Sequence, residues 1–193
     1  MNTLILEQTE FGEVAVDVFQ KLVQSRTLFL TSEINDDSAS DIVATLLYLD
    51  SENSDEKITL FINSNGGDIR AALMIYDTLK MIKSPVSTIC IGSATDEAAL
   101  LHAAGEKGMR FATKNAVIAI SHIVHNSFGF GNLGDANSFY KLSEEDNKRM
   151  LQIIADASGK KLARVTKDFE RRVFMTASEA KAYGIIDRVR GES

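Results

Sequence analysis

Residues 58–82 read ITLFINSNGGDIRAALMIYDTLKMI. The first five are mostly apolar and indicate a buried strand, and the polar run after them contains two glycines, which is typical of a loop. From Ile69 to Ile82 the apolar residues recur at helical spacing. The stretch therefore predicts a strand, a glycine-rich loop and a helix in direct succession.

The same succession continues downstream. Pro85 separates the helix from an apolar strand predicted at 86–91. The loop 92–97 leads into a helix predicted at 98–104, and another strand is expected at 116–120. Strands that alternate with helices predict an α/β fold with a mainly parallel sheet and covering helices. In such sheets, chemistry gathers at the carboxyl ends of the strands.

The upstream residues fit the same plan. Apolar residues at helical spacing predict a helix at 13–25, and the run 27–31 predicts a strand. Polar residues at 36–38 offer N-caps for a further helix that runs through Leu49.

The C-terminal third departs from this alternation. A glycine-spaced segment at 125–135 predicts a hairpin, and it precedes an amphipathic helix of about 20 residues to Ala157, which Gly159 ends. This helix is longer than a small sheet needs for cover, so we expect part of it to project and to pack against another subunit. A capped helix is predicted at 176–184, with a last strand at 185–186.

Length and charge limit what the chain can be. With 193 residues, 45% of them hydrophobic, it can bury one core, and we expect a single domain. The net charge of −6 without a basic run argues against nucleic acid or a membrane as the main partner. Three histidines and one cysteine without ligand spacing predict no metal site, and no cofactor is expected.

Targeting and redox signals are weak. Cys90 lies in the apolar strand and is the only cysteine, so no internal disulfide can form and a reducing compartment is compatible. Residues 1–7 show neither a charged leader nor a long apolar stretch. We therefore expect a cytoplasmic protein, or one of the plastid stroma, or of the host cytoplasm if the chain is viral.

Seven short strings, taken in order, carry a resemblance to a known family. They are EQT (7–9), GE (12–13), RTLFL (26–30), INSNGG (62–67), IYDT (75–78), STICIG (87–92) and FMT (174–176). From about residue 7 to 189 the chain resembles ClpP, the proteolytic subunit family of the ATP-dependent Clp protease. The resemblance implies a crotonase-like α/β subunit that assembles into heptameric rings, two of which stack through a handle formed by the long helix and its hairpin.

The resemblance also implies an organisation and a set of partners. It divides the single domain into an axial N-terminal segment (1–12), a head (13–120 plus 160–193) and a handle hairpin and helix (121–159). The expected partners are further copies in a heptamer or a stacked double heptamer, catalytic ClpP subunits, and AAA+ ATPases such as ClpX, ClpA or ClpC. Whether the ring is homomeric or mixed stays open.

The three triad positions of the family hold other residues here. The family's nucleophilic serine lies four residues after the glycine of the STICIG-like string, which is Asp96 in this chain. Its histidine follows the run 115–120, which leads to Ser121, and its aspartate lies two residues before Phe174, which is Arg172. The resemblance therefore implies that no triad is intact, and we predict a proteolytically inactive member of the ClpR kind.

Part of the loop that holds the oxyanion in the family is present in this chain. Gly66 and Gly67 match the family's oxyanion-loop glycines, and Glu97 follows the nucleophile position. A carboxylate at Asp96 would compete for these donors, although it could equally act as a helix N-cap. A further hypothesis pairs Asp96 with Arg172, directly or through water, because the two substitutions introduce opposite charges.

Two outer surfaces are also implied by the resemblance. Glu170 and Arg171 match the residues through which family rings contact one another. Thr59, Phe61 and Met81 stand where the family tends to place aromatic residues for ATPase docking, so we expect that surface to be altered.

Two other functions stay open. Crotonase-fold hydratases and isomerases use a glycine-rich loop with acidic residues, and the adjacent carboxylates 96 and 97 could be so used. Alternatively, a serine endopeptidase could act through a rearranged site, with Ser93 or Ser121 as nucleophile and His122 or His125 as base. Strand side chains alternate between faces, so His122 should point away from the direction of Ser121.

Overall fold

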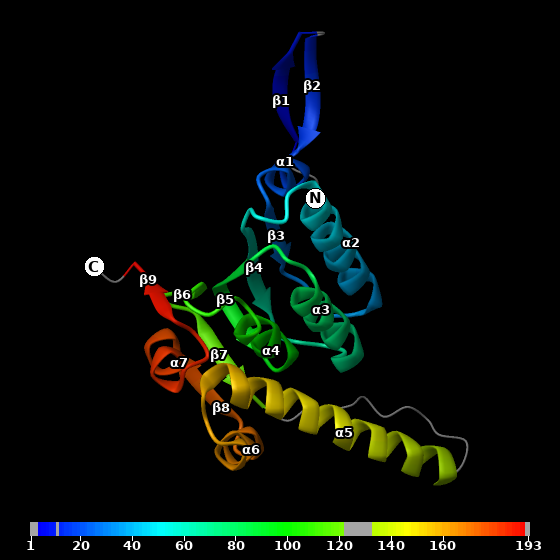
Figure 1. The fold of residues 1–193 in the computed structure, drawn as a ribbon, viewed down its shortest axis with the longest axis vertical. Coiled ribbons are helices and arrows are strands. Elements are labelled where there is room, and N and C mark those ends of the chain that lie inside the picture. Colours follow the sequence, from blue (N-terminus) through cyan, green and yellow to red (C-terminus); the bar gives the residue numbers. More distant parts are fainter. Residues whose placement is uncertain (1–3, 11, 122–132, 192–193) are drawn as a thin grey trace.

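The computed structural model describes residues 4–10, 12–121 and 133–191, and their central element is a seven-stranded sheet (Figure 1). Its strands are β3 (Thr27–Leu30), β4 (Ile58–Ser64), β5 (Val86–Thr95), β6 (Arg110–Thr113), β7 (Val117–Ile120), β8 (Val173–Thr176) and β9 (Arg188–Arg190). The order is β3-β4-β5-β6-β9, and β7 pairs with both β5 and β8. Only the β7–β8 pair of this sheet is antiparallel. The predicted α/β class with a mainly parallel sheet is confirmed.

Seven helices lie around this sheet in the described part of the chain. They are α1 (Val18–Gln24), α2 (Asp36–Glu52), α3 (Ile69–Met81), α4 (Glu97–Ala103), α5 (Leu133–Ser158), α6 (Leu162–Glu170) and α7 (Ala177–Tyr183). Figure 1 shows α5 running past the head and extending beyond it, as expected for a projecting helix. None of the helices in the described ranges is both long and apolar enough to cross a bilayer.

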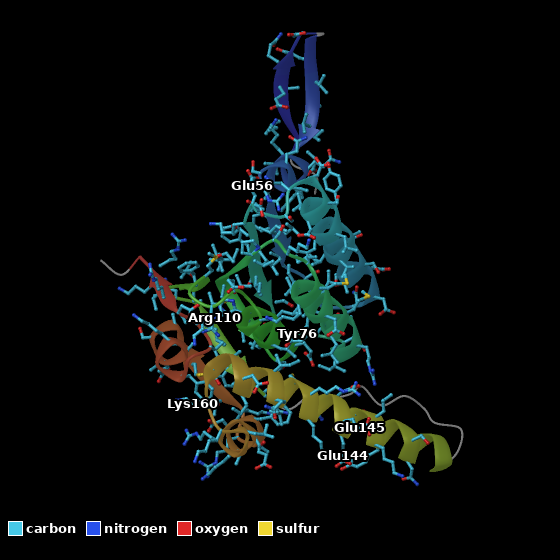
Figure 2. The ribbon with its side chains drawn as sticks, in the orientation of Figure 1. Glu56, Tyr76, Arg110, Glu144, Glu145 and Lys160 are labelled. Carbon is cyan, nitrogen blue, oxygen red and sulfur yellow. The ribbon has the colours of Figure 1, made fainter. Side chains whose placement is uncertain are left out.

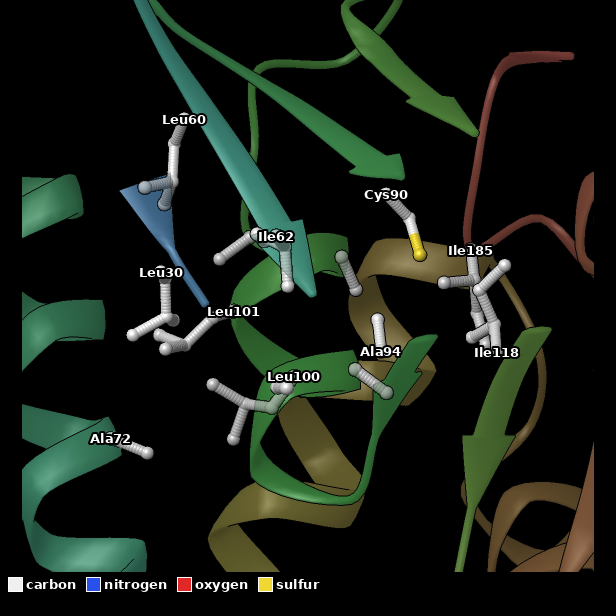
Figure 3. Packing of buried hydrophobic residues seen from close by; sticks show 14 of the residues in the cluster. Leu30, Leu60, Ile62, Ala72, Cys90, Ala94, Leu100, Leu101, Ile118 and Ile185 are labelled. Atoms are coloured by element: carbon white, nitrogen blue, oxygen red, sulfur yellow. The ribbon is translucent and has the colours of Figure 1, made fainter. Parts of the chain in front are cut away.

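The core lies between the sheet and its helices, with buried residues from α2, α3, α4, α5, α6 and α7. Strand β4 alternates buried aliphatic side chains with more exposed ones, β5 is buried at its first three residues and at Cys90 and Ala94, and α4 is buried along its whole length. Figure 3 shows Leu60 and Ile62 of β4 facing Leu100 and Leu101 of α4. Burial of apolar side chains such as these is the dominant favourable contribution to folding.

Local sequence signals define where several helices begin and end. Asp68 caps α3 by accepting hydrogen bonds from the N–H groups of Arg70 and Ala71. Thr176 and Glu179 form a capping box at the start of α7, and Gly184 ends that helix with a φ of 101°. The predicted capped helix that stops at glycine is therefore confirmed.

The N-terminal prediction is partly wrong. Residues 12–17 form strand β2, which pairs with β1 (Leu4–Thr9) in a hairpin that stands clear of the sheet in Figure 1, and the helix begins only at Val18. The Asp17 side chain accepts hydrogen bonds from the N–H groups of Phe19 and Gln20, and this cap sets the boundary. In α2 the cap is Asn35, one residue before the predicted run, with Ser38 completing a capping box.

The strands near the candidate site also differ from prediction. β5 continues through the predicted loop to Thr95, because residues 93–95 pair with 117–119 of β7. Strands β6 and β8 and helix α6 were not foreseen, and the last strand lies at 188–190 rather than 185–186. The predicted hairpin at 125–135 lies largely outside the described residues.

A buried ion pair joins β6 to the segment before β9. The Arg110 side chain is 4% exposed, and its Nε and Nη2 atoms donate to the two carboxylate oxygens of Asp187 at 3.0 and 2.7 Å. Asp187 also accepts from the N–H groups of Gly108 and Arg110. Figure 2 shows Arg110 on this side of the molecule, where the C-terminal elements meet the sheet. The pair therefore fastens the start of β9 to β6.

Replacing Asp187→Asn should lower the free energy of unfolding by about 3 kcal/mol, because Arg110 would keep a buried charge without its partner. Urea denaturation followed by circular dichroism measures this. Asp55→Asn is the control, since Asp55 is exposed, and it should change stability by less than about 0.5 kcal/mol. Equal unfolding midpoints for the two variants would contradict the assigned role of the ion pair.

Candidate functional site

A sharp turn connects β5 to α4 at Asp96. This residue has φ 54° and ψ −116°, a conformation that residues other than glycine rarely adopt. Its N–H donates to the carbonyl of Ala119 at 3.0 Å, and its own carbonyl accepts from Ala99 and Leu100 in the first turn of α4. Pairing of β5 with β7 therefore holds a strained strand-to-helix elbow at the carboxyl end of the sheet.

The carboxylate of Asp96 binds the residue that follows β7. Its Oδ1 atom accepts hydrogen bonds from the backbone N–H of Ser121 at 3.0 Å and from the Ser121 hydroxyl at 2.5 Å. It makes no capping hydrogen bond to α4, although Asp96 occupies the N-cap position. The N-cap interpretation of this side chain is therefore wrong, because Asp96 Oδ1 accepts its hydrogen bonds from Ser121 and not from α4.

The third predicted position lies beside the second. The antiparallel β7–β8 register pairs Ile120 with Val173, so Ser121 and Arg172 are the next residues at the same end of the ladder. Contacts thus join positions 96 and 121, and the register of β7 with β8 places position 172 beside position 121.

Arg172 nevertheless makes no ion pair with Asp96. Its side chain is exposed, and within the described ranges no carboxylate lies within 4.0 Å of its guanidinium. The hypothesis of a direct Asp96–Arg172 pair is wrong, and two physical reasons account for this. Ser121 already satisfies the carboxylate, and an exposed pair would add little stability.

The glycine loop after β4 is fixed against the strand-to-helix segment before α2. The Gly66 carbonyl accepts from the N–H of Ile34 at 2.9 Å, and the Asp68 N–H donates back to the Ile34 carbonyl at 2.7 Å. A Cβ at Gly67 would overlap the Ile34 backbone, and one at Gly66 would overlap the carboxylate of Glu97. Only glycine allows this close approach.

Glu97 occupies the donor that this loop offers. The Gly67 N–H donates to Glu97 Oε2 at 3.0 Å, whereas Glu97 Oε1 is buried and has no hydrogen-bond partner. Glu97 is 2% exposed, and burial raises the pKa of its carboxyl group to about 7. The expectation that Asp96 takes up the donors of the glycine loop is therefore wrong. Glu97, its neighbour on α4, accepts the Gly67 N–H instead.

A polar depression of about 500 Å³ lies beside the loop. Its walls come from the ends of β3, β4 and β5, and its lining residues are Thr31, Ser32, Glu33, Asn63, Ser64, Asn65, Gly66, Gly67 and Ser93. The Ser93 hydroxyl donates to Asn65 Oδ1 at 3.0 Å, and the Ser93 N–H donates to Asn63 Oδ1 at 3.0 Å. Sequence reasoning gave neither asparagine a role, although the place of Asn63 at the end of β4 and of Asn65 in the loop after it was a usable signal. An amide oxygen is too weak a base to activate a hydroxyl.

Neither His102 nor Asp168 offers a base to a nucleophile at the elbow. His102 is fully buried, neither of its ring nitrogens has a partner, and burial lowers its pKa to about 3. Asp168 accepts from Arg164 Nε at 2.7 Å and from the Tyr183 hydroxyl at 3.0 Å, so it joins α6 to α7. His122 and His125 lie outside the described residues.

A strained strand-to-helix elbow beside a glycine loop is an arrangement found in α/β enzymes that carry a nucleophile at the elbow. Residues 10–193 match the family model described as Clp protease. The chain belongs to the Clp protease family. Its fold is the ClpP fold, so the family resemblance found in the sequence is confirmed.

The two predicted outer surfaces lie on different elements. Glu170 and Arg171 are exposed at the end of α6. Phe61 stacks on Phe29 with ring centroids 5.2 Å apart, whereas Met81 is 66% exposed at the end of α3. Their assignment to ring contact and ATPase docking stays a prediction, as does that of Thr59.

Glu97→Gln should stabilise the protein at pH 8 by about 1 to 3 kcal/mol relative to the wild type. The pKa of about 7 in the folded state lies above the ordinary value of 4.5 for a glutamate, so the wild type loses stability as the pH rises from about 4.5 through about 7. At pH 4.5 the advantage of the variant should vanish. Urea denaturation at both pH values tests this.

Glu144→Gln serves as the matched control, because Glu144 is exposed on α5. Its stability relative to the wild type should not depend on pH over this range. A pH-independent difference between Glu97→Gln and the wild type would show that Glu97 is ionised normally.

Proposed function

We propose that this chain is a non-proteolytic subunit of a Clp protease ring, of the ClpR kind, with a structural or regulatory role. The observation that carries the proposal is Asp96 at the elbow, where its carboxylate is held by the N–H and hydroxyl of Ser121. A peptide bond is attacked by a hydroxyl or thiol activated by a base. Here the elbow presents an anion, and the neighbouring Ser121 hydroxyl donates a hydrogen bond to that anion.

The Gly67–Glu97 contact supports the same conclusion independently. Acyl transfer requires backbone donors that are free to bind the developing oxyanion. The Gly67 N–H is instead bonded to a buried side chain of the same chain. Even if a nucleophile were added, the Gly67 N–H would therefore be unavailable to the developing oxyanion.

The alternative of an active serine site has less support. The Ser93 hydroxyl donates to an amide oxygen, and the Ser121 hydroxyl donates to a carboxylate that no further described group orients as a base. Both hydroxyls are in hydrogen bonds that hold the loop and the elbow in place.

The crotonase-like alternative is favoured by one observation, the raised pKa of Glu97. A carboxyl group that titrates near neutral pH suits proton transfer. Neither Glu97 nor Asp96 lines the polar depression, however, and Glu97 is 2% exposed. An acyl-thioester hydration assay separates this function from the proposed one.

Family members form ring oligomers, and we infer that this chain enters a heptameric ring of its own or a mixed ring with catalytic subunits. The length of α5 and its extension beyond the head support this inference, as does the exposure of Glu170 and Arg171. Docking of an AAA+ ATPase at the surface of Thr59, Phe61 and Met81 would then be weak. The proposed compartment is the cytoplasm or plastid stroma, or the host cytoplasm for a viral chain.

The purified chain should not hydrolyse short fluorogenic peptides above background, and a fluorophosphonate probe should not label it. Intact mass spectrometry detects labelling, and fluorescence detects hydrolysis. Turnover that Ser93→Ala or Ser121→Ala abolishes would overturn the proposal.

Rebuilding the missing groups gives a second prediction. The triple variant Asp96→Ser, Ser121→His and Arg172→Asp should remain poorly active while Glu97 occupies the Gly67 N–H. Adding Glu97→Met should raise peptide hydrolysis by roughly 100-fold over the triple variant, because an oxyanion donor contributes about that much. Thermal melts confirm that each variant is folded, and equal rates for the triple and quadruple variants would contradict the role given to Glu97.

Native mass spectrometry of the chain, alone and mixed with a catalytic ClpP, should show ring-sized assemblies that contain it. Shortening α5 by deleting two of its turns should reduce the stacking of rings. A strictly monomeric chain that also ignores the catalytic subunit would refute the assembly part of the proposal while leaving the inactivity untouched.

A further inference from the structure

The glycine loop contains a reactive pair of residues that the proposed function does not use. Asn65 is followed by Gly66, and no other asparagine of the sequence precedes a glycine. The main-chain nitrogen of a following residue can attack an asparagine side chain, and a side chain on that residue hinders the attack. Glycine offers no such hindrance, because it has no Cβ. The sequence therefore opposes this attack less at position 65 than at its other asparagines.

The side chain of Asn65 is accessible and already polarised. Asn65 is exposed and lies between β4 and α3, outside the helices and strands. Its Oδ1 atom accepts a hydrogen bond from the Ser93 hydroxyl at 3.0 Å. Such a donor makes the side-chain carbonyl carbon more electrophilic and stabilises the negative charge that develops on the oxygen during attack. Ser93 is thus placed to assist an attack on Asn65.

The attacking nitrogen is also held by the loop. The Gly66 N–H donates to Ser64 Oγ at 3.2 Å, and the Ser64 hydroxyl donates in turn to the carbonyl of Ser32 at 2.6 Å. Gly66 has a φ of 91°, which glycine adopts without strain. The hydrogen bond from Gly67 to Glu97 lies beyond the reacting atoms. The Ser64 oxygen therefore lies at the proton that the Gly66 nitrogen must lose.

We propose that Asn65 is a site of spontaneous modification, at which the Gly66 nitrogen attacks the side-chain carbonyl carbon of Asn65. The new N–C bond closes a succinimide ring. The C–N bond to the side-chain amino group breaks, and ammonia leaves with the proton that the Gly66 nitrogen gives up. Water then opens the ring at either carbonyl, so that position 65 becomes aspartate or isoaspartate. The whole reaction consumes one water, releases one ammonia and needs neither an oxidant nor a reductant.

A neighbouring asparagine provides a control within the same chain. Asn63 Oδ1 also accepts a hydrogen bond from Ser93, in this case from its N–H at 3.0 Å. The residue after Asn63 is Ser64, which carries a side chain and pairs with Ala94 at the end of β4. The nitrogen of Ser64 is therefore both hindered and fixed in the sheet. Asn63 should stay intact where Asn65 reacts, although both asparagines bond to Ser93.

The isoaspartate product changes the loop, because the loop has no room for a longer main chain. In isoaspartate the main chain runs through the side chain, which adds one methylene group immediately before Gly66. A Cβ on Gly66 would already overlap Glu97, and a Cβ on Gly67 would overlap the backbone of Ile34. The lengthened loop loses the hydrogen bond between Gly67 and Glu97. The modification therefore acts as a one-way switch of the loop conformation.

The test incubates the purified full chain in neutral and in mildly alkaline buffer and follows every asparagine by digestion and tandem mass spectrometry. Position 65 should exchange its amide for an acid, take up oxygen from isotopically labelled water, and react faster in the alkaline buffer, because the Gly66 nitrogen must lose a proton. An isoaspartyl methyltransferase should then label position 65. Asn63 should remain an amide over the same period.

Two variants separate the roles of the residues. Asn65→Gln should lose the modification, because the longer side chain does not close the same ring. Ser93→Ala should slow it about fivefold, which corresponds to one neutral hydrogen bond. The matched control is Ser51→Ala, which removes an exposed hydroxyl on α2 and should leave the rate unchanged. Circular dichroism verifies the fold of each variant.

The change of the loop has a readout of its own. The isoaspartate fraction, separated by ion exchange, should unfold at a lower urea concentration than the fresh protein, because it lacks the hydrogen bond between Gly67 and Glu97.

Three results would each count against the inference. They are equal rates at positions 65 and 63, an unchanged rate in Ser93→Ala, and equal urea midpoints for the modified and fresh proteins. Peptide hydrolysis enters none of these measurements, so their failure leaves the proposed inactivity intact, and the discovery of proteolytic activity would leave this modification site intact.

Discussion

The parallel pairing of the end of β5 with β7 is the constraint on which the site depends. Residues 93–95 pair with 117–119, and the Asp96 N–H adds one more hydrogen bond to Ala119. The chain must then turn abruptly into α4, which gives Asp96 its positive φ and brings its carboxylate to Ser121. The same turn places Glu97 at the start of α4, within reach of the glycine loop. The strained elbow at Asp96, the hydrogen bonds of its carboxylate with Ser121 and the hydrogen bond between Gly67 and Glu97 thus all follow from the pairing of β5 with β7.

Much of the fold was predictable because buried apolar residues recur along the sequence with the period of the helix or strand that carries them. Buried aliphatic residues marked β4, α3 and α4, and glycine with a capping box marked the end and start of α7. The failures have physical causes. Val14 and Val16 fit both a helical and an alternating pattern, and only pairing with β1 decides for the strand. Strands β6 and β9 are too short for a clear period.

The site was predictable in position but not in its contacts. Family resemblance located positions 96, 121 and 172, and β-sheet register brings them together. The sequence does not show which carboxylate accepts the hydrogen bond of the Gly67 N–H, since Asp96 and Glu97 are adjacent and chemically alike. The outcome depends on backbone direction at the elbow, which turns one carboxylate to Ser121 and the other to Gly67.

The strained φ of Asp96 has a consequence for how such a site can change. A backbone angle of 54° costs energy whichever side chain is attached, and neighbouring hydrogen bonds sustain it. The fold therefore does not depend on which side chain stands at position 96. Substitutions at the tip of the elbow can exchange one chemistry for another, or for none, while the sheet and its helices keep their arrangement.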